Sequence, residues 1–197
     1  MIGTGKRKLV LVTLFVVLAN VLDLLSTYSA SPDLAEEWNA LNRVFGMGWG
    51  ALISAKLIGG FIAVAGYAYY LRYRTDCYPP AGADRDTFYR HFALGRSDSQ
   101  LSSGDTRHLV MSLGYFWTGM QLLVVWVAID NMLLKYGWVF PMRSVSELGY
   151  HLFQSAIIGF IVLVRFHRVN YNRYIQRATA ASAQPGFNAR TEAGLAR

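Results

Sequence analysis

The chain has 197 residues, of which 53% are hydrophobic and 16% charged, and its formal net charge is +7. The charged fraction is well below the roughly one quarter typical of soluble domains, so the composition excludes an ordinary soluble globular protein. The single cysteine, Cys77, excludes an intrachain disulfide and a multi-cysteine metal site.

Four apolar blocks are long enough to cross a membrane as helices. The hydrocarbon core of a bilayer requires about 20 apolar helical residues, and few charges interrupt these blocks. We therefore expect an all-α integral membrane protein whose residues 1–176 form a four-helix bundle of two transmembrane hairpins. The expected spans are 9–29, 47–71, 109–134 and 148–166.

The first block has a second interpretation as a cleaved signal peptide. Lys6, Arg7 and Lys8 precede it, and small residues occur in the stretch STYSAS at 26–31. However, the apolar stretch is long for a signal peptide, and Asp23 is unusual inside one. A transmembrane span is therefore favoured.

Three segments outside the spans have their own expected structures. Pro32 followed by DLAEEW predicts a short helix that begins near Asp33. In the loop 72–108, the stretch DRDTFYRHFALG predicts a short surface helix whose Phe88, Phe92 and Leu94 rest on the membrane. The tail 177–197 has few large apolar residues and is expected to be disordered.

Basic residues are distributed unequally between the two sides of the expected spans. The N-terminus, the 72–108 loop and the tail hold most of them, whereas the other side has only Arg43, Lys135 and Arg143. The positive-inside rule then predicts a bacterial inner-membrane protein with both termini in the cytoplasm. The net charge is explained by this topology and by anionic lipid headgroups, so no nucleic-acid partner is needed.

The second span carries small residues at every fourth position, which are Ala51, Ala55, Gly59 and Ala63. Such a stripe lets another helix approach closely. An internal packing seam is favoured over a homodimer seam.

Three polar residues of the first span share one helix face, because Asn20, Asp23 and Thr27 are spaced i, i+3 and i+7. Lys56 lies at a comparable depth in the antiparallel second span. An unpaired charge at mid-membrane costs about 2.5–3.5 kcal/mol, so we expect Asp23 and Lys56 to pair.

The polar residues of the first two spans and of their connection match the motif of a known family. The pattern D-x3-T, then E-x-N before Leu, then Lys in the next span, resembles a family of small bacterial multi-pass membrane proteins classed as a domain of unknown function. The matching residues are Asp23, Thr27, Glu37, Asn39 and Lys56, with Ala40 where the family usually has proline. The resemblance covers roughly residues 10–70 and implies a membrane hairpin without an assigned activity.

Two interpretations of this polar cluster stay open. Glu37 and Asn39 lie between the two helices and would complete a small polar cup at the outer face. As a structural clasp, Asp23 neutralises Lys56; as a functional site, the cup binds a ligand, an ion or a proton. The clasp is favoured because opposite charges already satisfy each other.

The later spans extend the cluster if their outer halves converge on it. Asp130, His151 and Gln154 start from the outer side. Together with Asp23 and Lys56 they would form an outward-facing pocket with a carboxylate–histidine pair that carries protons or holds a metal. Independent snorkelling at the interface explains Asp130 and His151 nearly as well.

His108 and His167 form a weaker candidate site at the cytoplasmic side. Two imidazoles on antiparallel neighbouring helices can ligate haem. The alternative is contact with lipid headgroups, and we expect no other cofactor and no metal.

The function classes follow from what the motifs exclude. The chain has no glycine-rich phosphate loop after a strand, no G-x-S-x-G and no H-E-x-x-H. We favour a non-catalytic accessory or assembly subunit, whose partners are the bilayer and another membrane protein or a second copy. A small transporter or ion-translocating component is the alternative, and a lipid-modifying enzyme is weaker.

Overall fold

The computed structural model describes residues 4–34, 46, 48–95 and 106–182. These residues form helices and no strand, as the composition predicts. The helices are α1 (Thr4–Ala30), α3 (Trp49–Tyr73), α4 (Arg85–Leu94), α5 (Thr106–Gly119), α6 (Gln121–Lys135), α7 (Pro141–Val145) and α8 (Glu147–Ser182). The short helix expected from Asp33 onward, in the stretch DLAEEW at 33–38, lies outside the described residues from position 35.

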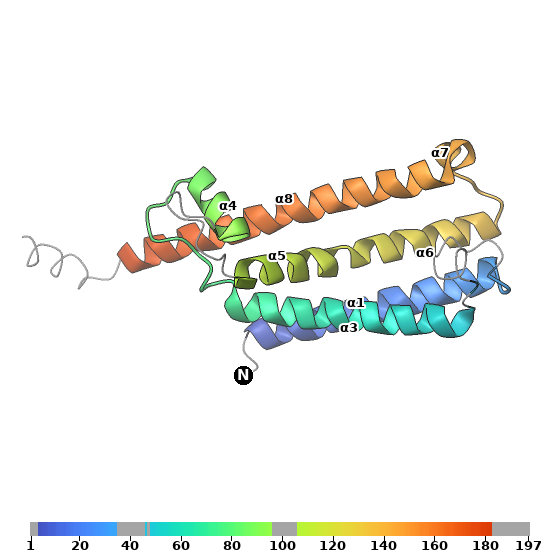
Figure 1. Ribbon diagram of the computed structural model, residues 1–197, viewed down its shortest axis with the longest axis horizontal. Helices are drawn as coiled ribbons and strands as arrows, with labels where there is room; N and C mark the ends of the chain where they lie inside the picture. Colours follow the sequence, from blue (N-terminus) through green and yellow to red (C-terminus); the bar gives the residue numbers. More distant parts are fainter. Residues whose placement is uncertain (1–3, 35–45, 47, 96–105, 183–197) are drawn as a thin grey trace, which may run out of the picture.

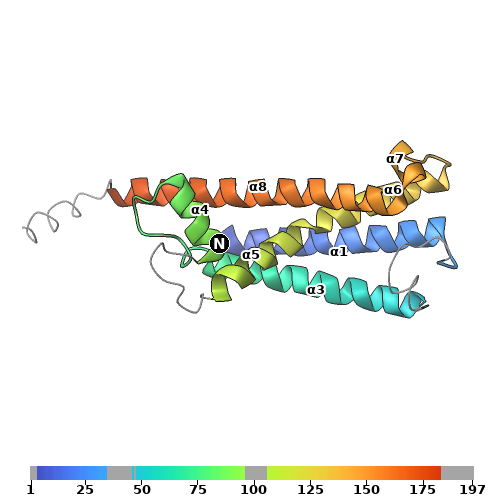
Figure 2. The same ribbon diagram turned by 45° about the horizontal axis from the view of Figure 1, so that its top comes forward.

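Four helical segments are long and apolar enough to cross a membrane, which confirms the number of spans expected from the apolar blocks. They are Gly5–Ala30, Trp49–Tyr73, Thr106–Lys135 and Glu147–Ala180. Figures 1 and 2 show these segments running side by side along the long axis of the molecule. We call the end where α1 begins and α8 finishes the basic end, and the end that carries α7 the opposite end.

The third segment is not one helix, because it is interrupted at Met120 between α5 and α6. No proline causes the break. Thr118 Oγ1 donates a 2.7 Å hydrogen bond to the Gly114 carbonyl, a contact that bends helices, and glycine follows at position 119. The segment also changes partner at this point, since α5 packs on α3 whereas α6 packs on α1. Figure 2 shows α5 and α6 crossing over the first two helices.

The closest approach between helices is the crossing of α3 and α5 at two glycines. A Cβ added to Gly66 would lie 2.7 Å from the Gly114 Cα, so neither position accepts a side chain. This contact lies three residues beyond the predicted small-residue stripe. Within that stripe Ala63 is fully buried, whereas nothing lies within 4 Å of a Cβ at Gly59, and Ala51 and Ala55 are half-buried.

An aromatic cluster joins α3, α4, α5 and α8 at the basic end. The prediction that Phe88 and Phe92 rest on the membrane is wrong, because both are fully buried in this cluster. Their rings pack on Tyr174 and Phe166 of α8, which removes more apolar surface from water than contact with headgroups would. The Leu94 side chain lies outside the described side chains.

Helix α8 is longer than its predicted span. It continues from Glu147 to Ser182, so the first residues of the tail expected to be disordered are helical. Tyr174 gives a reason, because its hydroxyl donates to the Pro80 carbonyl at 2.7 Å and accepts from the Ala83 N–H at 2.8 Å. These bonds attach the extension to the α3–α4 connection.

Candidate functional site

The polar face of α1 meets α3 at a buried ion pair. Asp23 is 2% exposed, and its Oδ2 pairs with Nζ of Lys56, whose side chain is 23% exposed. The other carboxylate oxygen, Oδ1, has no hydrogen-bond partner among the described residues. The carboxylate is therefore held mainly by the lysine, at the depth that the antiparallel register of the two helices predicts.

The same face of α1 contacts α6 above and below the ion pair. Asn20 Nδ2 donates to the Val16 carbonyl at 2.8 Å and to Gln121 Oε1 at 2.9 Å. Thr27 Oγ1 accepts from Asn131 Nδ2 at 3.1 Å. All three polar residues of the predicted face thus point at another helix, and hydrogen bonds of this kind hold helices together in an apolar environment.

Glu37 and Asn39, the two cup residues predicted for the outer connection, lie outside the described residues. Nearby, Trp49 Nε1 donates to the Pro32 carbonyl at 2.8 Å, and its ring packs edge-on against Tyr28 at 5.7 Å. These contacts close the α1–α3 hairpin next to the ion pair.

A second buried carboxylate lies on another side of α6. Asp130 is 1% exposed and pairs with Arg143 of α7, with 2.5 Å between Oδ2 and Nη1. Tyr150 donates its hydroxyl to Asp130 Oδ1 at 3.2 Å, and Arg143 also pairs with Glu147 at 3.0 Å. Arginine, rather than the histidine that the sequence suggested, is the partner of this carboxylate.

His151 and Gln154 contact each other on α8, with 3.2 Å between Nδ1 and Oε1. Gln154 is 4% exposed, and it lines an apolar cavity of about 270 Å³ together with Trp126, Phe140 and Tyr150. No hydrogen bond or ion pair between described residues joins these groups to Asp23 or Lys56. The residues expected to converge in one outward pocket are therefore placed in two groups, one on each side of α6.

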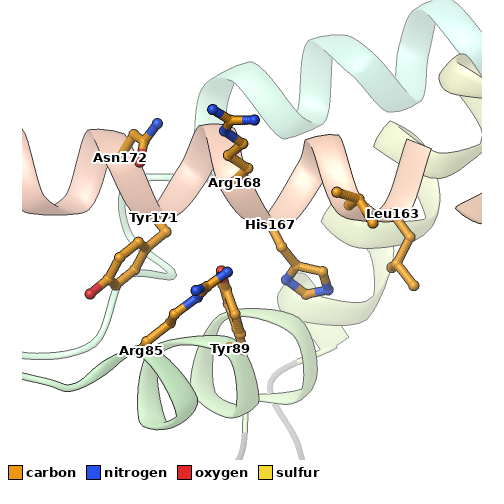
Figure 3. Close-up of a pocket in the computed structure, with 8 residues that line it drawn as sticks. Arg85, Tyr89, Leu163, His167, Arg168, Tyr171 and Asn172 are labelled. Atoms are coloured by element: carbon orange, nitrogen blue, oxygen red, sulfur yellow. The ribbon is translucent and has the colours of Figure 1, made fainter. Parts of the chain in front are cut away.

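The two histidines of the haem hypothesis have different neighbours. His108 Nδ1 lies 3.1 Å from the Phe92 carbonyl, and its ring is 5.4 Å from the His91 ring. His167 faces α4, 4.8 Å from the Tyr89 ring, in a cavity of about 590 Å³ between α4 and α8 (Figure 3). No ring contact in the described part of the chain links the two imidazoles.

The described residues contain no group of three or more His, Cys, Asp or Glu placed to hold a metal ion.

Sequence reasoning missed several residues of these contacts, among them Gln121, Thr118 and Arg143. Gln121 was the available signal for the α1–α6 contact, because it is an amide in the middle of an otherwise apolar block. Arg143 is the first cation after the turn that ends this span, whereas Lys135 lies on the same helix as Asp130. Thr118 carried no signal, since threonine is tolerated throughout membrane helices.

No family model, no curated protein and no solved structure matches the chain. The resemblance to the family of unknown function therefore rests on its motif residues alone.

Proposed function

We propose that this chain is a non-catalytic multi-pass membrane protein that serves as an accessory or assembly subunit of a larger membrane complex. One observation carries the proposal: both buried carboxylates of the described residues are used in internal ion pairs. Asp23 pairs with Lys56, and Asp130 pairs with Arg143. A carboxylate that is neutralised within its own chain holds helices in register, whereas a proton carrier or a cation ligand must exchange partners.

Helix α8 supplies the surface for the partner. It packs on α4, α5, α6 and α7, and large side chains on its apolar part remain exposed. Phe160 is 67% exposed and Leu152 61%. Another membrane protein that packs against this helix would cover these side chains, since tight packing drives helix association in lipid.

The location belongs to the same proposal. The four segments form a bundle in a bacterial inner membrane, with the basic end in the cytoplasm. The first residues of α1 and the last turns of α8 lie at that end (Figure 1), where lysine and arginine predominate. Membership of the resembled family remains part of this proposal, and the α1–α3 hairpin with its Asp23–Lys56 pair is the part that supports it.

The proposal is tested by photocrosslinking in native membranes. A crosslinking amino acid replaces Phe160 of α8 or, as a matched control, Phe61 of α3, which is 74% exposed. We expect one protein to be captured at high yield from position 160 and only lipid from position 61. Lipid adducts alone from both positions, with a monomeric mass in mild detergent, would contradict an accessory role.

A second candidate function, ion or proton translocation, is favoured by the interruption at Met120. Broken helices line the substrate sites of many transporters, and here the break lies next to Gln121, which bonds to Asn20 one turn from Asp23. Flux assays in proteoliposomes test it. Wild-type protein that raises proton or cation flux over the Asp23→Asn/Lys56→Met variant would replace the accessory proposal.

A further inference from the structure

A groove at the basic end separates α1 from α8. It has a volume of about 690 Å³, and α3, α5 and α6 contribute to its floor. It is distinct from the cavity of Figure 3, which lies between α8 and α4 on another side of α8. None of the ion pairs described above belongs to it.

Three cations line this groove: Lys8 from α1, and Arg165 and Arg173 from α8. Arg74 stands close by, with its guanidinium 5.4 Å from the centre of the Tyr70 ring. Arg173 and Arg74 are both near enough to Lys8 to repel its charge. Like charges that lie this close together favour the binding of an anion between them.

No carboxylate of the described residues provides that anion. None of the four cations forms an ion pair among the described residues. Within the described part of the chain, Arg173 donates a 3.1 Å hydrogen bond to the Tyr70 hydroxyl, which itself donates to Asn170 Oδ1. The guanidinium groups of Arg165 and Arg173 line the groove without a carboxylate partner, and such groups match the oxygens of a phosphate.

The rest of the groove is apolar and follows the helix axes toward the middle of the spans. On α1 the lining passes from Lys8 to Leu11, Val12 and Phe15. On α8 it passes from Arg173 through Val169 and Arg165 to Ile161, one residue per turn on a single face. A cationic end that continues into an apolar channel has the polarity of a phospholipid, whereas a free phosphate would leave the channel uncovered.

We propose that this groove binds one phospholipid with an anionic headgroup from the leaflet at the basic end. The phosphate lies among Lys8, Arg165 and Arg173, and an acyl chain runs along Leu11 and Phe15. The site rests on the membrane location proposed above and not on the accessory role. Failure to bind lipid therefore leaves the photocrosslinking test of that role unaffected.

Native mass spectrometry of the full chain tests the site. Delipidated protein is mixed with equimolar phosphatidylglycerol and phosphatidylcholine, and we expect one phosphatidylglycerol per chain in preference to phosphatidylcholine. The Lys8→Gln/Arg165→Gln variant should lose this adduct by roughly tenfold, since each cation near anionic lipid contributes appreciably. The Arg7→Gln/Arg168→Gln variant should keep it, because these exposed neighbours on the same two helices do not line the groove.

Several results would overturn the assignment. One is equal binding of the two lipids, and another is a phosphatidylglycerol adduct that survives in Lys8→Gln/Arg165→Gln. Displacement of the lipid by millimolar inorganic phosphate would also overturn it, as would a mass spectrum that shows a dimer of the chain in place of bound lipid. A thermal scan of the wild type covers the case in which the groove variant does not fold. Phosphatidylglycerol should raise the melting temperature of the wild type more than phosphatidylcholine does, and an equal effect of both lipids would also overturn the site.

Discussion

The two buried carboxylates of the described apolar helices are tolerated because each has a cationic partner on a neighbouring helix. Asp23 is 2% exposed and pairs with Lys56, and Asp130 is 1% exposed and pairs with Arg143. An ion pair of this kind is worth little in itself, but removal of one partner leaves an uncompensated charge. The consequences of single and paired substitutions therefore differ.

The first prediction concerns this difference at the Asp23–Lys56 pair. Asp23→Ala leaves Lys56 without a counterion and should destabilise the protein by about 3 kcal/mol, so its abundance in the membrane should fall. Adding Lys56→Met should restore abundance, because no charge then remains. Fluorescence-detected size exclusion of a tagged protein measures both. Unchanged abundance in Asp23→Ala would end the clasp interpretation.

A second prediction concerns His91 of α4, which lies outside the spans. Burial, and then the neighbouring His108, lower the pKa of His91 below the ordinary value of 6.5. The folded state thus binds this proton less readily than the unfolded state. The contribution of His91 to stability is complete above pH 6.5 and is lost as the pH falls below that value. The melting temperature should decrease between pH 7 and pH 5, and His91→Gln should reduce that decrease; an identical pH profile in both proteins would contradict it.

At the scale of the helices, backbone proximity decides which pairs form. α3 and α5 cross where Gly66 and Gly114 face each other, and the single hydroxyl proton of Thr118 is shared between the Gly114 and Ala63 carbonyls, each 2.7 Å from Oγ1. Farther along, Gly119 lets Val162 of α8 approach so closely that a Cβ would lie 2.4 Å from Cγ1. Without apolar driving force between helices in lipid, such contacts are the main source of specificity.

The third prediction compares two glycines of α3. Gly66→Ala places a Cβ 2.7 Å from the Gly114 Cα and should lower stability by about 1–3 kcal/mol, because backbone cannot move aside as a side chain does. Gly59→Ala meets no atom within 4 Å and should be neutral or stabilising, since alanine is the better helix former. Thermal unfolding in detergent separates them, and equal effects would show that the crossing is not at Gly66.

At the scale of the whole molecule, the two ends differ in chemistry. The basic end combines the aromatic cluster around Phe88 with the lysine and arginine side chains of the groove. The opposite end has the Asp130–Arg143 pair and exposed apolar residues on the α6–α7 connection, such as Trp138. By the positive-inside rule, this unequal distribution of basic residues predicts that the basic end faces the cytoplasm.

The fourth prediction tests the orientation that follows. Val145 at the opposite end is 86% exposed, and Ala81 at the basic end is also exposed. A membrane-impermeant thiol reagent added to intact spheroplasts should label Val145→Cys but not Ala81→Cys until the membrane is opened. The wild type serves as background, because its Cys77 is only 2% exposed. The reverse labelling pattern would invert the topology.

The sequence alone determined the helical class, the four candidate spans and the polar face of Asn20, Asp23 and Thr27. These follow from apolar length and from helical spacing, which are local properties. The prediction that Asp23 pairs with Lys56 required only that two consecutive spans be antiparallel.

Only the tertiary structure decided the contacts that join distant segments. Helix α6 packs on both α1 and α8, so Asn131 bonds to Thr27 on one side while Asp130 pairs with Arg143 on another, and the predicted outer pocket is divided into two groups. The burial of Phe88 and Phe92, and the meeting of Lys8 with Arg165 and Arg173, depend on how α8 lies against the other helices. Helix packing in an apolar solvent is set by shape and by a few polar contacts, and neither leaves a period in the sequence.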